Sequence, residues 1–360
     1  HDSGITKLLI LLRKRSVTRL IKRKTNIGLY KFKVNSIIKK ILFALNFMFP
    51  VENLLKYSCI FNKCDTSKYS KIFYFSDTFS NYDILAKSSK SKTKICCLVY
   101  SWDNIYQDKY FPSYSYYYFW SAIIRDNFVS NFSFRKHLSL VSGSIQSSIV
   151  HQLQVNDVTN LDNKKYHIFF ACSSHDRKYY LEEIKFIIFI SKLLISLGFD
   201  FILYFKPYYT DVDSLSDFNI LEKYNIIIYE DHLDLISNNG SKTYVYNVSQ
   251  FHKRLQFIND CDLYINIGTT MILEVAHLNT SILQIHKDFF LADENSCYLY
   301  DWVNVEHLDL IFNNSLSCIK SYSSLKSALL GFLKNDSSLI QDNLIYKNYL
   351  KQILGEPITL

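Results

Sequence analysis

Short apolar runs alternate with amphipathic helical stretches through the second half of the chain, and this alternation constrains the fold more than any other feature. Residues 167–173 are predicted to form a buried strand, 182–198 a helix with acids at its start and a glycine at its end, and 199–207 the next strand. Apolar strands separated by helices are typical of a parallel sheet, because the crossover helices bury both of its faces. Further strands are predicted at 225–230, 242–247, 262–268 and 281–286, and helices at 248–261 and 269–279.

The first half repeats the pattern, with strand, helix and strand predicted at 71–76, 80–89 and 93–101. A polar segment without periodicity follows, and 360 residues suit two domains of about 150 residues each. Because the chain begins at His1 rather than Met, we expect the first domain to be truncated at its start. The predicted organisation is an N-terminal α/β domain over 1–153, a linker over 154–166, a C-terminal α/β domain over 167–320 and a helical tail over 321–360.

Positive charge is concentrated at the start of the chain. Residues 1–50 carry 12 Lys and Arg against one acid, whereas the remainder carries 29 Lys and Arg against 32 acids. The slightly acidic remainder argues against a nucleic-acid partner. Residues 5–24 and 34–49 have the spacing of amphipathic helices, and two interpretations stay open: ordinary helices packed on a sheet, or basic faces that touch anionic lipid.

The cysteines and the apolar runs indicate the redox compartment of the chain and whether it can cross a membrane. Eight cysteines show no regular spacing and no secretory signal accompanies them, so we expect buried thiols in a reducing compartment. Cys59 and Cys64 lack further ligands at zinc-site spacing, and no metal site is expected. The longest apolar run, 41–51, is too short to span a bilayer, so we expect a soluble or membrane-peripheral chain.

Ligands of open α/β sheets bind at the carboxyl ends of the strands, so polar residues there are the candidates for a site. In the segment 265–274, Gly268 permits a tight turn, and Thr269 and Thr270 offer hydroxyls and amides at a helix N-terminus, which suits a phosphate. Glu274 lies one to two turns further along the same helix, within reach of a ribose. The alternative is an ordinary helix cap and a surface Glu.

Two more strand ends in the second half carry polar residues. Ser173, Ser174, His175 and Arg177 combine hydroxyls, an imidazole and a cation, which suits a diphosphate or acid–base work; the alternative is a solvated loop. Lys206 ends the following strand and is either a ligand to an anion or a solvated charge.

In the first half, Asp103 and Asn104 follow an apolar strand directly. Asp103 can act as a general base or bond an acceptor hydroxyl; the alternative is an Asx turn capped by Trp102. The sequence contains no P-loop, GxGxxG, HExxH or GxSxG motif, which argues against ATPases, typical dehydrogenases, zincins and α/β-hydrolases.

Several of these segments resemble a known family. The first half carries SWDN at 101–104, Trp-Ser at 120–121 and VSGSIQSS at 141–148, and the second half carries matching segments at 168–178 and 261–276. Together they are similar to GT-B glycosyltransferases of bacterial surface-polysaccharide synthesis, near the group of the CDP-glycerol glycerophosphotransferases.

The resemblance covers roughly residues 70–300 and has three departures. Where relatives have Arg-x-His-Pro, residues 204–207 are Tyr-Phe-Lys-Pro, so the His is missing. Ser148 stands where the family often has Asp, and Val275 separates Glu274 from the following Ala. The missing His argues against a polyol-phosphate transferase.

The resemblance implies an α/β chain of two Rossmann-like domains that face a cleft, the GT-B architecture, here with basic amphipathic N-terminal helices. It implies no metal and no cofactor, because the nucleotide sugar is a substrate. It also implies that the second domain binds the donor and the first the acceptor. The strand-end residues that we then expect at the donor site are Ser173, Ser174, Arg177, Lys206, Gly268, Thr269, Thr270 and Glu274. We expect Asp103 and His175 to be catalytic, and Trp102 and Asn104 to lie on the acceptor side.

The leading hypothesis is a cytoplasmic, metal-independent glycosyltransferase, peripheral to the inner face of the plasma membrane through residues 5–45. It moves a sugar from a nucleotide-sugar donor to a lipid-linked or glycan acceptor in surface-polysaccharide synthesis, such as that of a capsule or lipopolysaccharide. Three alternatives stay open: a CDP-glycerol-type polyol-phosphate transferase, a non-catalytic nucleotide-sugar-binding partner of an assembly complex, and a sugar-nucleotide 2-epimerase.

Overall fold

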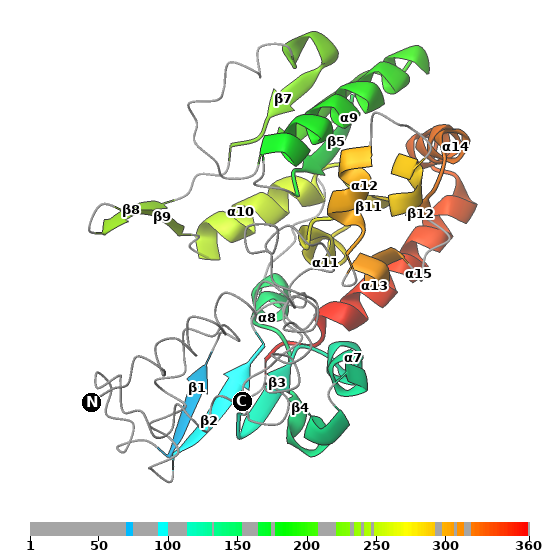
Figure 1. The fold of residues 1–360 in the computed structure, drawn as a ribbon. Coiled ribbons are helices and arrows are strands. Elements are labelled where there is room, and N and C mark those ends of the chain that lie inside the picture. The colour runs from blue at the N-terminus through cyan, green and yellow to red at the C-terminus, as the bar shows by residue number, and fades with distance from the viewer. Residues whose placement is uncertain are drawn as a thin grey trace, which may run out of the picture. The chain divides into compact units, whose positions relative to one another are not determined.

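The chain divides into two compact units, His1–Gly143 with Leu360 and Ser144–Thr359 (Figure 1). The stretches predicted to be helical at 5–24, 34–49 and 80–89, and most of the predicted linker, lie outside the described residues. The computed structural model describes residues 70–74, 93–99, 114–131, 133–152, 165–173, 177–207, 221–230, 234–238, 241–245, 248–291, 297–305, 308–312 and 318–358.

The first unit is built on a parallel sheet. Its strands are β1 (Lys71–Tyr74), β2 (Lys94–Leu98), β3 (Tyr116–Phe119) and β4 (Ser139–Val141), in the spatial order β1-β2-β3-β4. Every neighbouring pair is parallel, which confirms the α/β prediction for this half. β2 is the apolar strand expected at 93–101, and its Cys96 and Cys97 side chains are fully buried.

The third strand of this sheet was not expected from the sequence. In β3 the buried Tyr117 and Phe119 alternate with the half-buried Tyr116 and Tyr118. The two buried rings pack against Phe128 of helix α7 (Ala122–Asn131), with ring centroids 5.2 Å and 4.9 Å apart. The alternation is that of a strand, but aromatic residues on both of its sides conceal it in the sequence.

The second unit holds a larger sheet, in which all neighbouring strands are parallel and the spatial order is β12-β11-β10-β5-β6-β7. The chain starts at the central β5, runs outward through β6 and β7, returns to the other side of β5 at β10, and runs outward again to β12. The direction of winding therefore reverses between β5 and β10. The strands are β5 (Tyr166–Ala171), β6 (Phe201–Lys206), β7 (Ile226–Ile228), β10 (Leu263–Asn266), β11 (Ser281–Ile285) and β12 (Cys318–Ile319).

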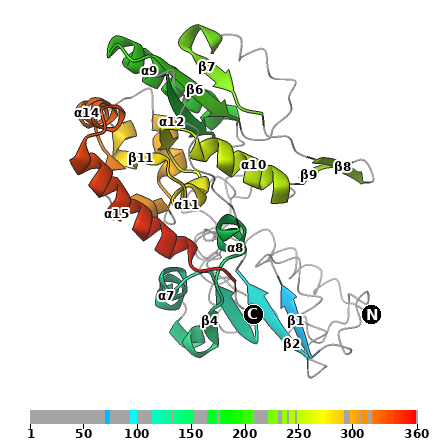
Figure 2. The same ribbon diagram turned by 180° about the vertical axis from the view of Figure 1, so that it is seen from behind.

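Helices cover both faces of this sheet. Successive side chains of a strand point to opposite faces, and the neighbours Phe169 and Phe170 of β5 show which helix lies on each. Phe169 packs against Phe257 of α10 (Val248–Asn259), and Phe170 packs against Phe186 of α9 (Arg177–Ser196). α9 and α10 thus lie on opposite faces (Figures 1 and 2), as expected for a doubly wound α/β unit.

The division between the units lies at Gly143 and Ser144, before the segment predicted as linker. The reason is helix α8 (Ile145–His151), which packs against α10 and α11 (Met271–Val275) of the second unit. His252 of α10 donates a hydrogen bond of 3.1 Å from its Nε2 to the carbonyl of Ile149 in α8. The contacts of α8 therefore lie within the second unit.

The tail predicted to be helical forms α14 (Tyr322–Leu333) and α15 (Ser337–Leu354). Among the described residues, no helix combines the length and the apolar character needed to cross a membrane. The other elements of the second unit are η7 (Glu222–Tyr224), the antiparallel pair β8 (Asp234–Asn238) and β9 (Ser241–Val245), η8 (Lys287–Leu291), α12 (Cys297–Val303) and α13 (Asp309–Phe312); η5 (Ser133–Leu138) precedes β4 in the first unit.

Candidate functional site

The candidate site of the second unit lies at the carboxyl edge of its sheet. Because all the strands are parallel, their carboxyl ends lie along the same edge. In spatial order the edge presents His286 after β11, residues 268–270 after β10, Ser173 after β5 and Lys206 at the end of β6. The residues predicted from three separate segments thus come from the ends of neighbouring strands. The turn after β10 and Ser173 after β5 flank the point where the winding reverses.

The turn after β10 is held in shape by its own hydrogen bonds. The fully buried Asn266 donates from Nδ2 to Gln284 at 2.7 Å and accepts from the amide of Thr269 at 3.2 Å. The amide of Met271 donates to the Thr269 hydroxyl at 3.3 Å. Thr270 is exposed and its side chain makes no capping bond, so its hydroxyl is the group of the turn that can meet a ligand.

Gly268 has a different role from the one expected. Among the described glycines, those with positive φ are Gly143, Gly198 and Gly355, so the turn at Gly268 does not depend on a left-handed backbone. A Cβ atom at this position would instead lie 3.0 Å from Leu308 Cδ1 and 3.3 Å from Val303 Cγ1. A side chain at position 268 would therefore crowd Leu308 and Val303, which approach the backbone closely here.

Glu274 takes part in a buried ion pair. The helix predicted over 269–279 is regular only from Met271 to Val275, and Glu274 lies within it. Its Oε2 is 3.3 Å from Nη2 of Arg254, and the side chains are 15% and 6% exposed. The Arg254 guanidinium also lies over the Phe251 ring, 4.9 Å from its centroid. Glu274 is therefore not the surface Glu of the alternative interpretation.

The end of β5 is organised by Glu183, a residue that the sequence analysis did not single out. Its fully buried carboxylate accepts hydrogen bonds from the Ser173 amide at 3.0 Å, from the Ser173 hydroxyl and from the Cys172 thiol. The Ser173 hydroxyl proton is thus directed to Glu183, and toward a ligand the oxygen of this hydroxyl can act as an acceptor.

The start of α9 explains why Glu183 was overlooked. The helix begins at Arg177 rather than at 182, so Glu183 lies in its second turn instead of serving as a terminal acid. Glu183 falls on the same stripe as the fully buried Ile187, Ile190 and Leu194, at i, i+4, i+7 and i+11. An acidic residue among the apolar residues of one helix face was the sequence feature that could have marked Glu183 as buried.

Lys206 is buried, with 6% of its surface exposed, so the interpretation as a solvated charge is wrong. It pairs in register with Ala171 of β5, and its carbonyl accepts from the Cys172 amide at 2.9 Å. Lys206 thus lies beside the end of β5, which Ser173 follows. Burial of a charged group costs free energy, and buried cations are usually paired with other charges or bound by ligands.

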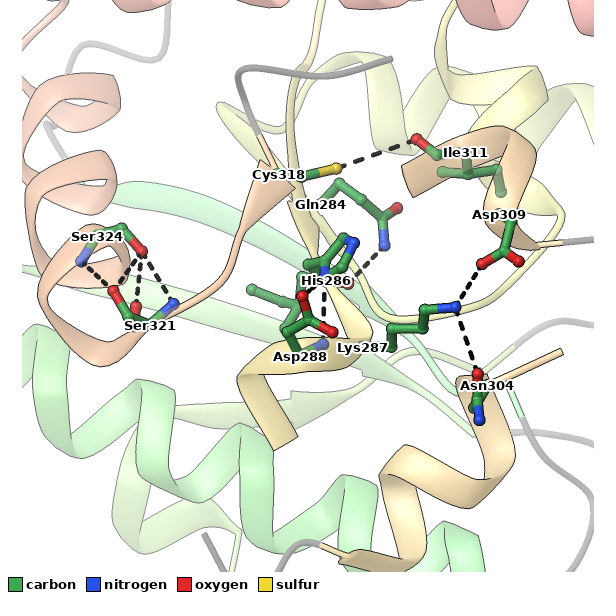
Figure 3. Close-up of polar contacts among 11 residues, drawn as sticks. Gln284, His286, Lys287, Asp288, Asn304, Asp309, Ile311, Cys318, Ser321 and Ser324 are labelled. Carbon is green, nitrogen blue, oxygen red and sulfur yellow. Dashed lines mark hydrogen bonds and ion pairs between the residues drawn. The ribbon is translucent and has the colours of Figure 1, made fainter. Parts of the chain in front are cut away.

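The end of β11 carries a polar cluster that the sequence analysis also missed (Figure 3). His286 accepts a hydrogen bond at Nδ1 from the Asp288 amide at 3.1 Å. Lys287 Nζ lies 2.6 Å from Asp309 Oδ1 and 3.3 Å from Asn304 Oδ1. Burial lowers the pKa of His286, and this effect outweighs the opposing effect of the Asp288 carboxylate. The signal in the sequence was a histidine directly after an apolar strand.

Of the other residues predicted for the site, Arg177 is the first residue of α9. Within the described stretches, no group of three or more His, Cys, Asp and Glu side chains is arranged to hold a metal ion. Trp102, Asp103, Asn104, Ser174 and His175 lie outside the described residues.

No protein-family model matches this chain, and no curated protein matches it. Solved structures do match. The chain is similar to S. aureus MnaA in a structure with UDP, at 10% identity and a TM-score of 0.47 over 98% of this chain and 90% of that one. It is similar to a putative UDP-N-acetylglucosamine 2-epimerase from Listeria monocytogenes, at 8% identity and a TM-score of 0.47 over 86% and 73%. A third match is the α,α-trehalose 6-phosphate synthase of Burkholderia multivorans, at 10% identity and a TM-score of 0.42 over 88% and 73%.

Proposed function

We propose that this chain is a glycosyltransferase that binds the diphosphate of a nucleotide sugar at the carboxyl edge of the second sheet. The observation that carries the proposal is the reversal of winding between β5 and β10, flanked on both sides by polar strand ends. In open α/β sheets a ligand binds in the crevice at such a reversal.

Two groups of this edge suit a diphosphate. Lys206 supplies a cation and Thr270 an exposed hydroxyl. Breaking the bond between the sugar C1 and the diphosphate oxygen leaves negative charge on the leaving group, which a cation and hydrogen-bond donors stabilise. Ser173 and Glu274 can accept hydrogen bonds from the hydroxyls of a ribose, since each carries an acceptor oxygen.

Attack by the acceptor hydroxyl needs a base. The acceptor hydroxyl forms the new bond to C1, and its proton passes to a carboxylate or an imidazole. We assign this role to Asp103, with His175 as the second acid–base group and Trp102 and Asn104 on the acceptor side. No metal is assigned to the reaction, because Lys206 and the polar groups of the edge take the charge of the leaving group.

The proposal extends to the setting of the reaction. The basic stretch at 5–45 would hold the enzyme at an anionic membrane surface, on the cytoplasmic side. An acceptor linked to a lipid, as in the synthesis of a surface polysaccharide, accounts for an enzyme held at that surface.

Transfer is tested with uridine, cytidine and guanosine nucleotide sugars, by measuring release of the nucleoside diphosphate. We expect release from one donor class, and we expect Lys206→Met to weaken binding of that nucleoside diphosphate about 10- to 100-fold. Lys223→Met, at an exposed lysine of η7, is the control and is expected to change nothing. Equal binding by the two variants would remove Lys206 from the site. Binding without release from any donor would favour the non-catalytic alternative.

A further inference from the structure

His286 is an almost enclosed imidazole at the strand-end edge. Its side chain is 8% exposed, and its ring meets that of Phe312 edge-on at a centroid distance of 5.0 Å. The backbone amide of His286 donates to the carbonyl of Ile319 in β12, so the residue is fixed at the end of two neighbouring strands. The ring is held by packing and by the strands, as a ligand-binding group requires.

The hydrogen bonds of the ring fix where its proton lies. Nδ1 accepts from the Asp288 amide and also lies 3.2 Å from Asp288 Oδ2. We assign the proton of the neutral ring to Nε2, because a proton on Nδ1 would face the amide hydrogen. Within the part of the chain that the structure describes, Nε2 has no hydrogen-bond partner and is not fully enclosed by the protein. His286 therefore offers an N–H donor that something other than the described protein can accept.

The position of this donor relates it to the turn after β10. Asn266 and Gln284 are register partners on β10 and β11, so the turn that follows Asn266 and the residue two places after Gln284 leave the sheet side by side. Neighbouring strands lie about 4.8 Å apart, so side chains from the two strand ends can bind the same diphosphate. Lys287 does not compete for the same ligand, because Asp309 and Asn304 hold its amine (Figure 3).

We propose that His286 binds the anionic diphosphate of the nucleotide by donating a hydrogen bond from Nε2. This inference rests on the proposed function and adds to it a ligand-contacting residue from a fourth strand. The diphosphate would then meet the imidazole of β11 and the threonine hydroxyl after the neighbouring β10, and the buried lysine would reach it from β6, on the far side of β5.

Two variants of His286 separate binding from a structural role. In His286→Gln the side-chain amide nitrogen reaches the position of Nε2 and keeps the donor toward the ligand. In His286→Asn the shorter side chain reaches only the position of Nδ1 and keeps an acceptor for the Asp288 amide. The control is His137→Asn, at an exposed histidine of the first unit.

The experiment titrates UDP, CDP and GDP into each protein by calorimetry, and records thermal unfolding without nucleotide. We expect His286→Gln to bind the preferred nucleotide within about threefold of the unaltered chain, and His286→Asn about 10- to 100-fold more weakly. His137→Asn should bind unchanged, and both His286 variants should unfold at similar temperatures.

The outcomes are distinguishable. If the unaltered chain binds none of the three nucleotides, the proposed function fails and this inference fails with it. If it binds one, but His286→Asn binds equally well, only the role of His286 is overturned. The reverse order, with His286→Asn retaining affinity and His286→Gln losing it, would show that the bond to Asp288 is the only role of the ring.

Discussion

The ion pair between Arg254 and Glu274 gives a prediction that follows from the unequal burial of its members. Replacing Glu274 with Met removes one anion beside a guanidinium that is 6% exposed, whereas replacing Arg254 with Met removes one cation beside a carboxylate that is 15% exposed. Breaking a buried pair costs several kcal/mol, so we expect Glu274→Met to destabilise the second unit by about 3 kcal/mol and Arg254→Met by about 2 kcal/mol. The double variant removes both charges, and its cost should not exceed about 1 kcal/mol.

Urea unfolding followed by circular dichroism measures these costs. With a slope of about 2–3 kcal/mol per molar, a loss of 3 kcal/mol moves the midpoint by about 1–1.5 M. The coupling is the difference between the double variant and the sum of the singles, and it should be favourable to the pair by several kcal/mol. Additive costs would refute the reasoning, because they would mean that the two charges do not compensate each other. A larger cost for Arg254→Met than for Glu274→Met would refute the argument from burial.

Three further predictions follow from single side chains. Gly268→Ala should destabilise the chain by about 1–3 kcal/mol in urea because its Cβ would crowd Leu308, and the same substitution should cost less in a Leu308→Ala background; no loss in the single variant would contradict the close approach. Burial, and then the charge of Lys351, lowers the pKa of His277 to about 4, so the unfolded chain binds a proton between pH 6.5 and 4 that the folded chain does not. Stability should therefore fall by about 1–2 kcal/mol across this window, after allowance for solvent screening, and less in His277→Asn; an identical fall in both would contradict this. Thr270→Val should weaken nucleoside diphosphate binding about tenfold in calorimetry with an unchanged unfolding temperature, and equal affinity would remove this hydroxyl from the site.

The buried parallel strands were the most predictable part of the fold. A strand covered on both faces is apolar at nearly every position, so the runs at 167–173, 262–268 and 281–286 mark β5, β10 and β11 within a few residues. Their shared carboxyl edge follows from parallel pairing. The sequence therefore placed Ser173 and the turn after β10 on one edge.

The rest depended on contacts that no local pattern encodes. β3 was hidden because aromatic residues occupy both of its sides. Glu183 was assigned to a helix terminus because the start of α9 was placed five residues too late, and its buried bonds to Ser173 are formed across the turn. The crowding at Gly268 comes from Leu308, which is 40 residues away in the chain.

His286 illustrates a second limit of sequence reasoning. One histidine after an apolar strand is not a motif, and it becomes a candidate only when the sheet order places it next to the turn after β10. The contact that bears on the tautomer of its ring is local, since the Asp288 amide two residues later folds back onto Nδ1, but it depends on a turn that the sequence does not mark.

The most direct test of the account is thermal unfolding of the unaltered chain with UDP, CDP, CMP, GDP and ADP. A ligand at 100 times its dissociation constant stabilises the folded state by about 2.7 kcal/mol, which gives a measurable rise in the unfolding temperature. The account predicts such a rise with one nucleoside diphosphate, and a smaller rise when Lys206→Met is tested at the same concentration. A folded chain whose unfolding temperature none of the five nucleotides changes would contradict the assignment of a nucleotide site to this edge.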